Sequence, residues 1–237
     1  MTREAGAGTA ATHTVLDPAS LPREDIFDLL SASVVPRPIA WTSTVGDDGV
    51  LNLAPFSFFT VVSAEPPMLS LTLEAAPDGR PKDTLRNIRS TGQLVVNLVS
   101  DDLAEQMSRT SPDYAAEVDE FQVGGVTPAP SVTVRPPRVA EARISMECVL
   151  HTVLTPGSDA LVISEVVAFH VARELLPPGG GHIDLGRLRP LGRIGARFTR
   201  VGGVFALPAP PRPDLPAKAQ KDEGPSCPMI PSSMTHP

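Results

Sequence analysis

Residues 38–59 read PIAWTSTVGDDGVLNLAPFSFF, and this stretch decides the fold class. Two β-like runs, 38–45 and 50–63, flank the turn sequence GDDG at 46–49. Strand-forming runs joined by a short turn that ends in Asp-Gly predict an antiparallel β-hairpin. Pro55 lies inside the second run and cannot donate a ladder hydrogen bond, so it predicts a bulge or a break there.

The chain beyond this hairpin continues with short strands and few helices. Residues 140–150 alternate apolar and polar side chains, which predicts a half-buried strand. After a turn at 155–159, residues 161–172 are apolar on both faces, which predicts a more buried strand. Further predicted elements are strands at 68–75 and 93–100 and short helices at 23–30, 83–92 and 101–108. Together these elements predict a mainly β fold, an antiparallel barrel with helices outside it.

Length and charge limit the domain count and the partners. The 237 residues suit one folded domain, expected at 15–206, with disordered ends at 1–14 and 207–237. The C-terminal segment is rich in proline and has little that could pack into a core. The formal net charge of -7 argues against binding to nucleic acid and against a polybasic membrane anchor.

Cysteine use and the N-terminal sequence suggest the compartment. Cys148 and Cys227 offer no readable disulfide framework, which favours a reducing environment. The N-terminus lacks a basic start followed by an apolar run, and no stretch is long enough to span a membrane. We therefore expect a cytoplasmic protein without a membrane-bound part.

The hairpin carries a set of groups that a flavin site requires. They are the hydroxyls of Thr42, Ser43, Thr44 and Ser57, the amide of Asn52, and the apolar side chains of Phe58 and Phe59. Pro55 should also free backbone N–H groups nearby. A flavin needs donors for its ring carbonyls and phosphate, and apolar walls for its dimethylbenzene edge. On composition alone, an ordinary strand pair with surface hydroxyls and core phenylalanines remains open.

The segment RPKDTLRNI, residues 80–88, resembles a phosphate site at a helix start. Unpaired N–H groups and the helix dipole attract anions there, and Lys82 and Thr84 would add a charge and a hydroxyl. Asp83 would repel a phosphate unless it turns inward to cap the helix, which we expect it to do. Gly92 is the expected stop. A capped surface helix with a solvated lysine is the alternative.

A glycine-rich segment near the end of the domain, residues 179–198, contains Arg187, Arg189 and Arg193. These arginines could reach a flavin or a partner subunit, or could be solvated surface groups. The glycines lack the spacing and the strand–helix context of a dinucleotide fold. The histidines have no metal-ligand spacing, and no nucleophile motif is present, so we predict neither a metal site nor a catalytic side chain.

Several of these strings together resemble a known family. They are RPIAWTSTVGDDGVLNLAPFSFFTVVSAEPPMLSL (37–71), KDTLRNIRSTGQLVVNLV (82–99), EFQVGGVTPAPSVTVRPPRVAEARISMEC (120–148) and LGRIG (191–195). Over roughly residues 20–200 the chain resembles the flavin reductase-like family with the FMN-binding split barrel, in the branch that includes flavoredoxin. The combination of RPIAW, NLAPFSFF and KDT is specific, and it favours the flavin interpretation of the local patterns.

The resemblance implies a six-stranded antiparallel split β-barrel with short flanking helices, in a homodimer that holds FMN near its interface. It implies a flavin site lined by Thr42, Ser43, Thr44, Asn52, Ala54, Pro55, Ser57, Phe58 and Phe59. It also implies that Lys82 and Thr84 hold the phosphate with help from Ser57, beside Asp83, and that Arg193 approaches the ring or the interface. The flavin N5 atom, and no side chain, would carry the chemistry.

The chain departs from the family pattern at two places. The closing segment often has a Tyr soon after its glycines, whereas this chain has RIGARF with Phe198. Shorter NAD(P)H-dependent members carry a His just after the C-terminal hairpin turn, whereas GSDALVISEV (157–166) has none. The flavoredoxin-like branch also tends to lack this His, so FMN binding is still expected. Whether NAD(P)H is the electron donor is left undecided by the sequence.

The leading hypothesis is an FMN-dependent oxidoreductase that passes electrons from NAD(P)H or a protein donor through the flavin. Its partners could include an oxygenase or an electron-transfer protein. A flavin-binding electron carrier or regulatory module without turnover is the alternative, motivated by the missing His. A reductase that uses flavin as a substrate, and a barrel that has lost the cofactor and serves as an interaction module, also remain open.

Overall fold

The computed structural model describes residues 13–76, 79–177 and 182–208 of the chain. The chain divides into two compact units, residues 1–202 and residues 203–237. All helices and strands described below belong to the first unit. The predicted disordered ends lie outside the described residues, apart from two residues at the inner end of each.

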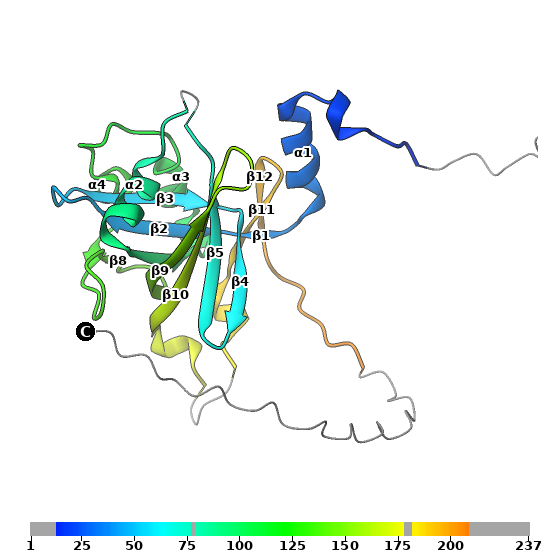
Figure 1. The fold of residues 1–237 in the computed structure, drawn as a ribbon. Coiled ribbons are helices and arrows are strands. Elements are labelled where there is room, and N and C mark those ends of the chain that lie inside the picture. The colour runs from blue at the N-terminus through cyan, green and yellow to red at the C-terminus, as the bar shows by residue number, and fades with distance from the viewer. Residues whose placement is uncertain (1–12, 77–78, 178–181, 209–237) are drawn as a thin grey trace, which may run out of the picture. The chain divides into compact units, whose positions relative to one another are not determined.

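The expected mainly β, antiparallel fold is confirmed, and the main sheet of the described residues has seven strands where six were expected (Figure 1). In spatial order the strands are β3 (Leu51–Phe56), β2 (Ala40–Val45), β6 (Gln93–Leu98), β9 (Ile144–Leu154), β10 (Ala160–Val171), β5 (Pro67–Leu73) and β4 (Phe59–Ala64). The count differs because the predicted run at 50–63 divides into β3 and β4.

The division of this run closes the sheet. The strands β3 and β4 are its two edges, yet only Ser57 and Phe58 separate them along the chain. The two edges must therefore approach each other at this point, and β3 also contacts β5, the neighbour of β4 in the sheet. The break predicted at Pro55 thus falls just after Phe56. Pro55 stays in β3 opposite Trp41, where an edge strand tolerates proline.

The remaining elements surround this barrel. The short strands β1 (Arg37–Pro38), β11 (Leu191–Ile194) and β12 (Arg197–Arg200) form a small sheet, and β7 (Pro128–Ala129) pairs with β8 (Arg138–Val139). The helices are α1 (Arg23–Ser33), α2 (Asp83–Thr91), α3 (Ala104–Arg109), α4 (Glu120–Gly124) and α5 (Leu185–Leu188), with single turns η1 (Pro18–Ser20), η2 (Asp101–Leu103) and η3 (Arg173–Leu175). No helix among the described residues is long and apolar enough to cross a membrane.

The strand β2 is buried on both faces because it separates two apolar clusters. Ala40 faces a cluster inside the barrel that includes Leu71 and Ile88. The next residue, Trp41, faces a second cluster with Phe121 on α4. Successive side chains of a strand point to opposite faces, so β2 contributes to both clusters. The helices α3 and α4 pack against β3, and side chains of both helices belong to the cluster that contains Trp41 of β2.

The strand predicted at 140–150 begins four residues later than expected, at Ile144. Its first three even positions are buried as predicted, but Ser145 and Glu147 at the odd positions are buried too. Their face is covered because Glu147 accepts hydrogen bonds from the backbone N–H groups of Val132, Thr133 and Val134, at 2.6–3.0 Å. The strand at 161–172 was predicted to be the more buried of the two, and this was wrong. The second half of β10 is partly exposed, and Phe169 is 60% exposed.

The helix α2 matches its predicted range, and Gly92 ends it in the left-handed conformation, with φ of 68°. The expected capping role of Asp83 was wrong. Lys82 is the N-cap residue and makes no side-chain capping hydrogen bond. Asp83 lies in the first turn instead, where its carboxylate pairs with Arg86 at 2.6 Å. The first N–H groups of α2 are therefore left without a side-chain cap.

Candidate functional site

Three adjoining hollows meet where β3 ends, because Pro55 and Phe56 line all of them. The Lys82 hollow, about 90 Å³, lies between β3 and the start of α2 and is also lined by Asn52, Ala54, Asp83, Thr84 and Glu120. The Phe58 hollow, about 140 Å³, is lined by Ser57, Phe58 and Lys82. The Arg193 hollow, about 150 Å³, is lined by Ser57, Arg193 and Phe198. Most of the predicted site residues thus lie around one stretch of β3.

The start of α2 brings positive charge to this stretch. Lys82 lines both the Lys82 hollow and the Phe58 hollow, and its Nζ atom lies 3.1 Å from Asp113 Oδ1. The uncapped N–H groups of the first turn add the positive end of the helix dipole. The negative charge of Asp83 is offset by its ion pair with Arg86. This end of the site is therefore suited to an anion.

Hydroxyl groups add directional donors to the same region. Thr84 Oγ1 accepts a hydrogen bond from Asn52 Nδ2 at 3.0 Å, and Ser57 Oγ accepts one from Arg37 Nε at 3.3 Å. Within the described residues neither hydroxyl makes another hydrogen bond. Since each oxygen already accepts an N–H, each hydroxyl hydrogen is available for an acceptor in the hollows.

Aromatic rings form the other side of the site. The Phe58 ring stacks on Phe27 of α1, with ring centroids 5.9 Å apart. The Arg37 guanidinium lies 5.7 Å from the centroid of the same Phe58 ring. In the Arg193 hollow, the Arg193 guanidinium lies over Phe198, 4.4 Å from its centroid. The hollows therefore combine a cationic, donor-rich end with apolar and cation–π surfaces.

Arg37 was not recognised from the sequence. Its side chain is buried, at 5% exposure, and donates to the Gly195 carbonyl at 3.2 Å as well as to Ser57. It also donates to the carbonyl of Ser31 at the end of α1. Burial, and to a smaller degree the charge of Arg193, lowers the pKa of Arg37. An arginine that precedes a proline in a short segment gives no local sign of such contacts.

Glu120 is the second residue that the sequence did not reveal. It begins α4, is 7% exposed, and accepts a hydrogen bond from the Leu53 N–H at 3.1 Å. Burial raises the pKa of Glu120 to about 7, and the nearby carboxylates of Asp83 and Asp119 raise it further, against the opposing effect of the Leu53 N–H. The site thus contains a carboxyl that titrates near neutral pH.

Four predicted residues lie outside the three hollows. Thr42, Ser43 and Thr44 are fully buried in β2, where Ser43 Oγ donates to the Pro137 carbonyl at 2.5 Å. The Thr44 hydroxyl oxygen accepts from Asn87 on α2 at 3.1 Å. Phe59 packs against the cluster inside the barrel. In this structure these residues support the strands behind the site.

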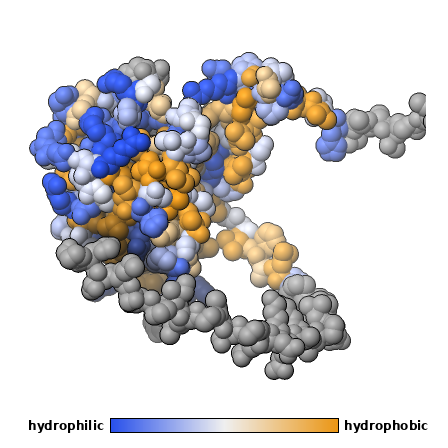
Figure 2. Space-filling view, viewed as in Figure 1, coloured by the Kyte–Doolittle hydropathy of each residue, from blue (hydrophilic) through white to orange (hydrophobic). Residues whose placement is uncertain are grey.

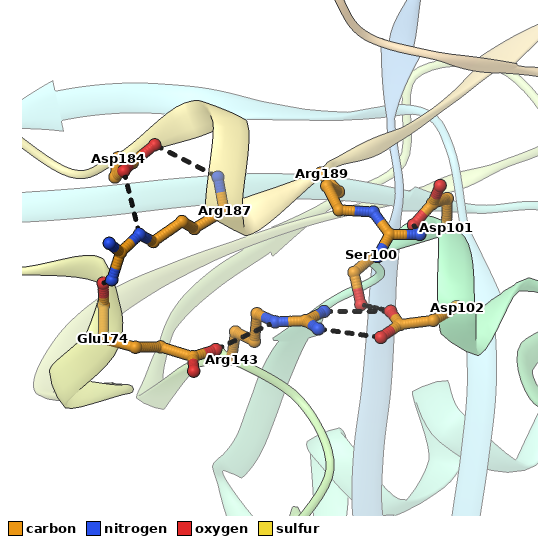
Figure 3. Close-up of polar contacts among 8 residues, drawn as sticks. All are labelled: Ser100, Asp101, Asp102, Arg143, Glu174, Asp184, Arg187 and Arg189. Atoms are coloured by element: carbon orange, nitrogen blue, oxygen red, sulfur yellow. Dashed lines mark hydrogen bonds and ion pairs between the residues drawn. The ribbon is translucent and has the colours of Figure 1, made fainter.

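Arg187 and Arg189 of the glycine-rich segment are engaged in ion pairs away from the hollows (Figure 3). Arg187 pairs with Asp184 at 3.3 Å, and Arg189 pairs with Asp101 at 2.6 Å. Arg143 forms a two-pronged contact with Asp102, at 2.8 and 2.9 Å. The Arg189–Asp101 pair fastens the segment before β11 to the region after β6, and the Arg143–Asp102 pair fastens the start of β9 to the same region. Only Arg193, of the three arginines considered, faces a hollow.

The family assignment follows from a direct comparison. The model of the flavin reductase like domain matches residues 32–191, which run from the end of α1 to the first residue of β11 and include Ser57, Lys82 and Thr84. The chain belongs to this family. The resemblance inferred from RPIAW, NLAPFSFF and KDT is therefore confirmed.

Relatives of the flavin reductase-like chain match over most of its length. An uncharacterized protein of Halalkalibacterium halodurans is 39% identical over 203 residues, which cover 82% of this chain and 96% of the relative. Component B of nitrilotriacetate monooxygenase from Bacillus cereus is a solved structure with 33% identity and a TM-score of 0.77, covering 82% of this chain and 98% of that chain. The 2-nitrobenzoate 2-nitroreductase NbaA of Pseudomonas fluorescens has 28% identity and a TM-score of 0.76, covering 87% and 100%.

The structural likeness also includes the flavoredoxin of Desulfovibrio vulgaris, at 20% identity and a TM-score of 0.66, which supports the fold. The split-barrel architecture and the family membership support a flavin-related oxidoreductase in general terms.

Proposed function

We propose that this chain is an FMN-dependent oxidoreductase that passes electrons from NAD(P)H, or from a protein donor, through bound FMN to an acceptor. The observation that carries the proposal is that Lys82 lines one hollow with Thr84 at the start of α2 and an adjoining hollow with Ser57, within the family-matching region. Ser57 lies between β3 and β4, and Lys82 is the N-cap residue of α2, yet both line one hollow. A site of this kind suits the terminal phosphate of FMN.

The donor set at this site fits a phosphate. The uncapped first turn of α2 offers backbone N–H groups, Lys82 offers a charge, and Thr84 and Ser57 offer hydroxyl hydrogens without another acceptor among the described residues. The phosphate would compete with Asp113 for Lys82, because these two side chains form an ion pair at 3.1 Å. The ion pair shows that the Lys82 ammonium group can bind a negatively charged oxygen at this position.

The neighbouring hollows fit a flat ring system. Phe58 and Phe198 provide apolar surfaces, and Arg193 provides a cation that could face a ring carbonyl. The flavin supplies the redox chemistry when it is bound, and the side chains bind and orient it. This division of tasks agrees with a site built from donors and aromatic rings.

A homodimer is part of the proposal. Large apolar side chains are exposed on α1 and β4, including Phe27 at 42%, Leu30 at 55% and Val61 at 69%. Figure 2 shows apolar residues on α1 and over this part of the sheet. Exposed apolar surface of this kind is typical of interaction sites. Sedimentation of the purified protein tests it, and a monomer at micromolar concentration would remove the dimer from the proposal.

The acceptor and the compartment are suggested by the relatives and the sequence. One solved neighbour is component B of a monooxygenase, which supports supply of reduced flavin to a partner oxygenase. Another neighbour is a 2-nitrobenzoate 2-nitroreductase, which supports direct reduction of a nitroaromatic compound as the second possibility. Cysteine use supports the cytoplasm as the compartment.

Two experiments test the proposal. Titration with FMN and with FAD, followed by quenching of the single tryptophan, should show tight binding of FMN, and a protein that binds neither flavin refutes the proposal. Lys82→Ala should weaken FMN binding by about 1–3 kcal/mol, the range for loss of one charge-assisted hydrogen bond. Lys218→Ala, outside the family-matching region, is the matched control and should leave the affinity unchanged.

A flavin-binding electron carrier or regulatory module is the second candidate. It is favoured by the β9–β10 turn and the start of β10, residues 157–166, which contain no histidine. Rapid mixing of the FMN-loaded protein with NADH and with NADPH separates the two candidates. Rapid bleaching of the flavin absorbance by either donor supports the reductase. Absence of bleaching with NADH and also with NADPH supports the carrier.

A further inference from the structure

Arg37 occupies an unusual place for a charged residue. Its guanidinium is buried where four segments meet, namely the end of α1, the strand β1, the β11–β12 turn and the Ser57–Phe58 crossing. Burying a charge is costly unless its donors find acceptors. Here they are the carbonyls of Ser31, Val34 and Gly195, and the hydroxyl oxygen of Ser57.

The contact with Ser57 differs from the three others in its consequence. A backbone carbonyl can only accept, whereas a hydroxyl both accepts and donates. Because Arg37 Nε donates to Ser57 Oγ at 3.3 Å, the oxygen is used as an acceptor there. The Ser57 hydrogen must then point elsewhere, and Ser57 lines the Phe58 hollow and the Arg193 hollow.

We propose that Arg37 is a positioning residue that fixes the Ser57 hydroxyl as a hydrogen-bond donor to a phosphate oxygen of the bound ligand. Lys82 lines the same Phe58 hollow as Ser57, which brings an ammonium group and an oriented hydroxyl to one ligand group. The inference rests on the proposed FMN site. It adds that Arg37 makes the Ser57 hydroxyl a donor, and not an acceptor, toward the ligand.

The site contains a second pair with the same logic. Asn52 Nδ2 donates to Thr84 Oγ1 at 3.0 Å, and the Thr84 hydroxyl makes no other hydrogen bond within the described residues. Both hydroxyls are therefore held by N–H donors from behind. Two such pairs in one site favour a ligand that is rich in acceptors, such as a phosphate, over one that donates.

The arrangement also links distant parts of the chain to the ligand. Arg37 holds the Gly195 carbonyl at 3.2 Å, and Gly195 lies in the turn between β11, which carries Arg193, and β12. The same guanidinium holds the C-terminal carbonyls of α1, whose Phe27 stacks on Phe58. Arg37 therefore contacts Ser57, the Phe58 ring and the turn that follows the strand of Arg193.

A double-mutant cycle on FMN affinity tests the proposal. Ser57→Ala should weaken FMN binding roughly tenfold, the effect of losing one hydrogen bond to a charged group. Arg37→Lys keeps the charge but loses the Nε donor, and should weaken it to a similar degree. If Arg37 acts through Ser57, the double variant should bind about as well as either single variant, because coupled residues are not additive. If the loss of FMN affinity in the double variant equals the product of the losses in the two single variants, the proposal is overturned.

Riboflavin, which lacks the phosphate, is the second probe. Its affinity should stay unchanged in Ser57→Ala, and an equal loss for riboflavin and FMN in that variant overturns the assignment to a phosphate oxygen. Thermal melting checks that Arg37→Lys folds, and if it does not, Ser57→Ala still decides, since unchanged FMN affinity in that variant refutes the oriented donor.

The exposed Arg89 on α2 provides the control Arg89→Lys, which should bind FMN normally. Failure of the wild-type protein to bind FMN would refute the proposed function itself. Normal wild-type binding with an additive cycle would refute the role of Arg37 alone.

Discussion

Replacement of Glu120 by glutamine should change how the stability of this protein depends on pH. The side chain is 7% exposed, and burial raises its pKa from an ordinary 4.5 to about 7. The folded protein therefore holds a proton on Glu120 at pH values where the unfolded chain has released it. Stability contributed by this proton is complete below pH 4.5 and is lost as the pH rises toward 7.

The size of the effect follows from the difference between the two pKa values. At about 1.36 kcal/mol for each pKa unit, the wild-type protein should lose roughly 3 kcal/mol of unfolding free energy between pH 4.5 and pH 8 on account of Glu120. Glutamine has nearly the same shape and can still accept the Leu53 N–H, but it does not titrate. The variant should therefore lack this part of the decline.

Urea denaturation of the ligand-free protein at pH 5, 6, 7 and 8 measures the difference. The unfolding free energy of the variant, relative to that of the wild type, should increase as the pH rises. The control is Glu117→Gln, at an exposed glutamate just before α4, which should run parallel to the wild type. A constant gap between Glu120→Gln and wild type across this range would show that Glu120 is already ionised at pH 5, and the argument from burial would be wrong.

Three further outcomes follow from single contacts. Asp113→Asn releases Lys82 from its ion pair and should tighten FMN binding about two- to fivefold at low salt, an effect that added salt removes in a fluorescence titration. Gly92→Ala places a side chain at a φ of 68° and should cost about 1 kcal/mol in thermal melting, without change in FMN affinity. Glu147→Ala leaves the N–H groups of residues 132–134 without their acceptor and should cost about 3 kcal/mol in urea denaturation, whereas an unchanged midpoint would contradict the structure.

Local patterns were enough to predict the elements on which the site is built. The β2–β3 hairpin follows from GDDG between two strand-like runs, and α2 follows from its polar start and Gly92. These features depend on neighbours in the sequence. Lys82 and Thr84 could be predicted as anion-binding residues for the same reason, since a helix start is a local property.

Features that depend on distant segments could not be predicted in this way. The burial of Glu147 requires residues 131–139 to fold over β9, and nothing within the strand announces this cover. The elevated pKa of Glu120 comes from burial of its carboxyl between α4 and β3, which outweighs the opposing hydrogen bond from the Leu53 N–H. The capping role expected of Asp83 was wrong because Arg86, one turn away, competes for its carboxylate.

The two-residue connection between the edge strands has a consequence for how this protein can evolve. Ser57 and Phe58 join β3 to β4, and they also line the hollows proposed for the flavin. An insertion there would let the sheet open and would at the same time displace the hydroxyl that we propose binds the ligand. The closure of the sheet and the proposed binding of the cofactor therefore depend on the same two residues, so a change in the length of this connection should be selected against for both reasons.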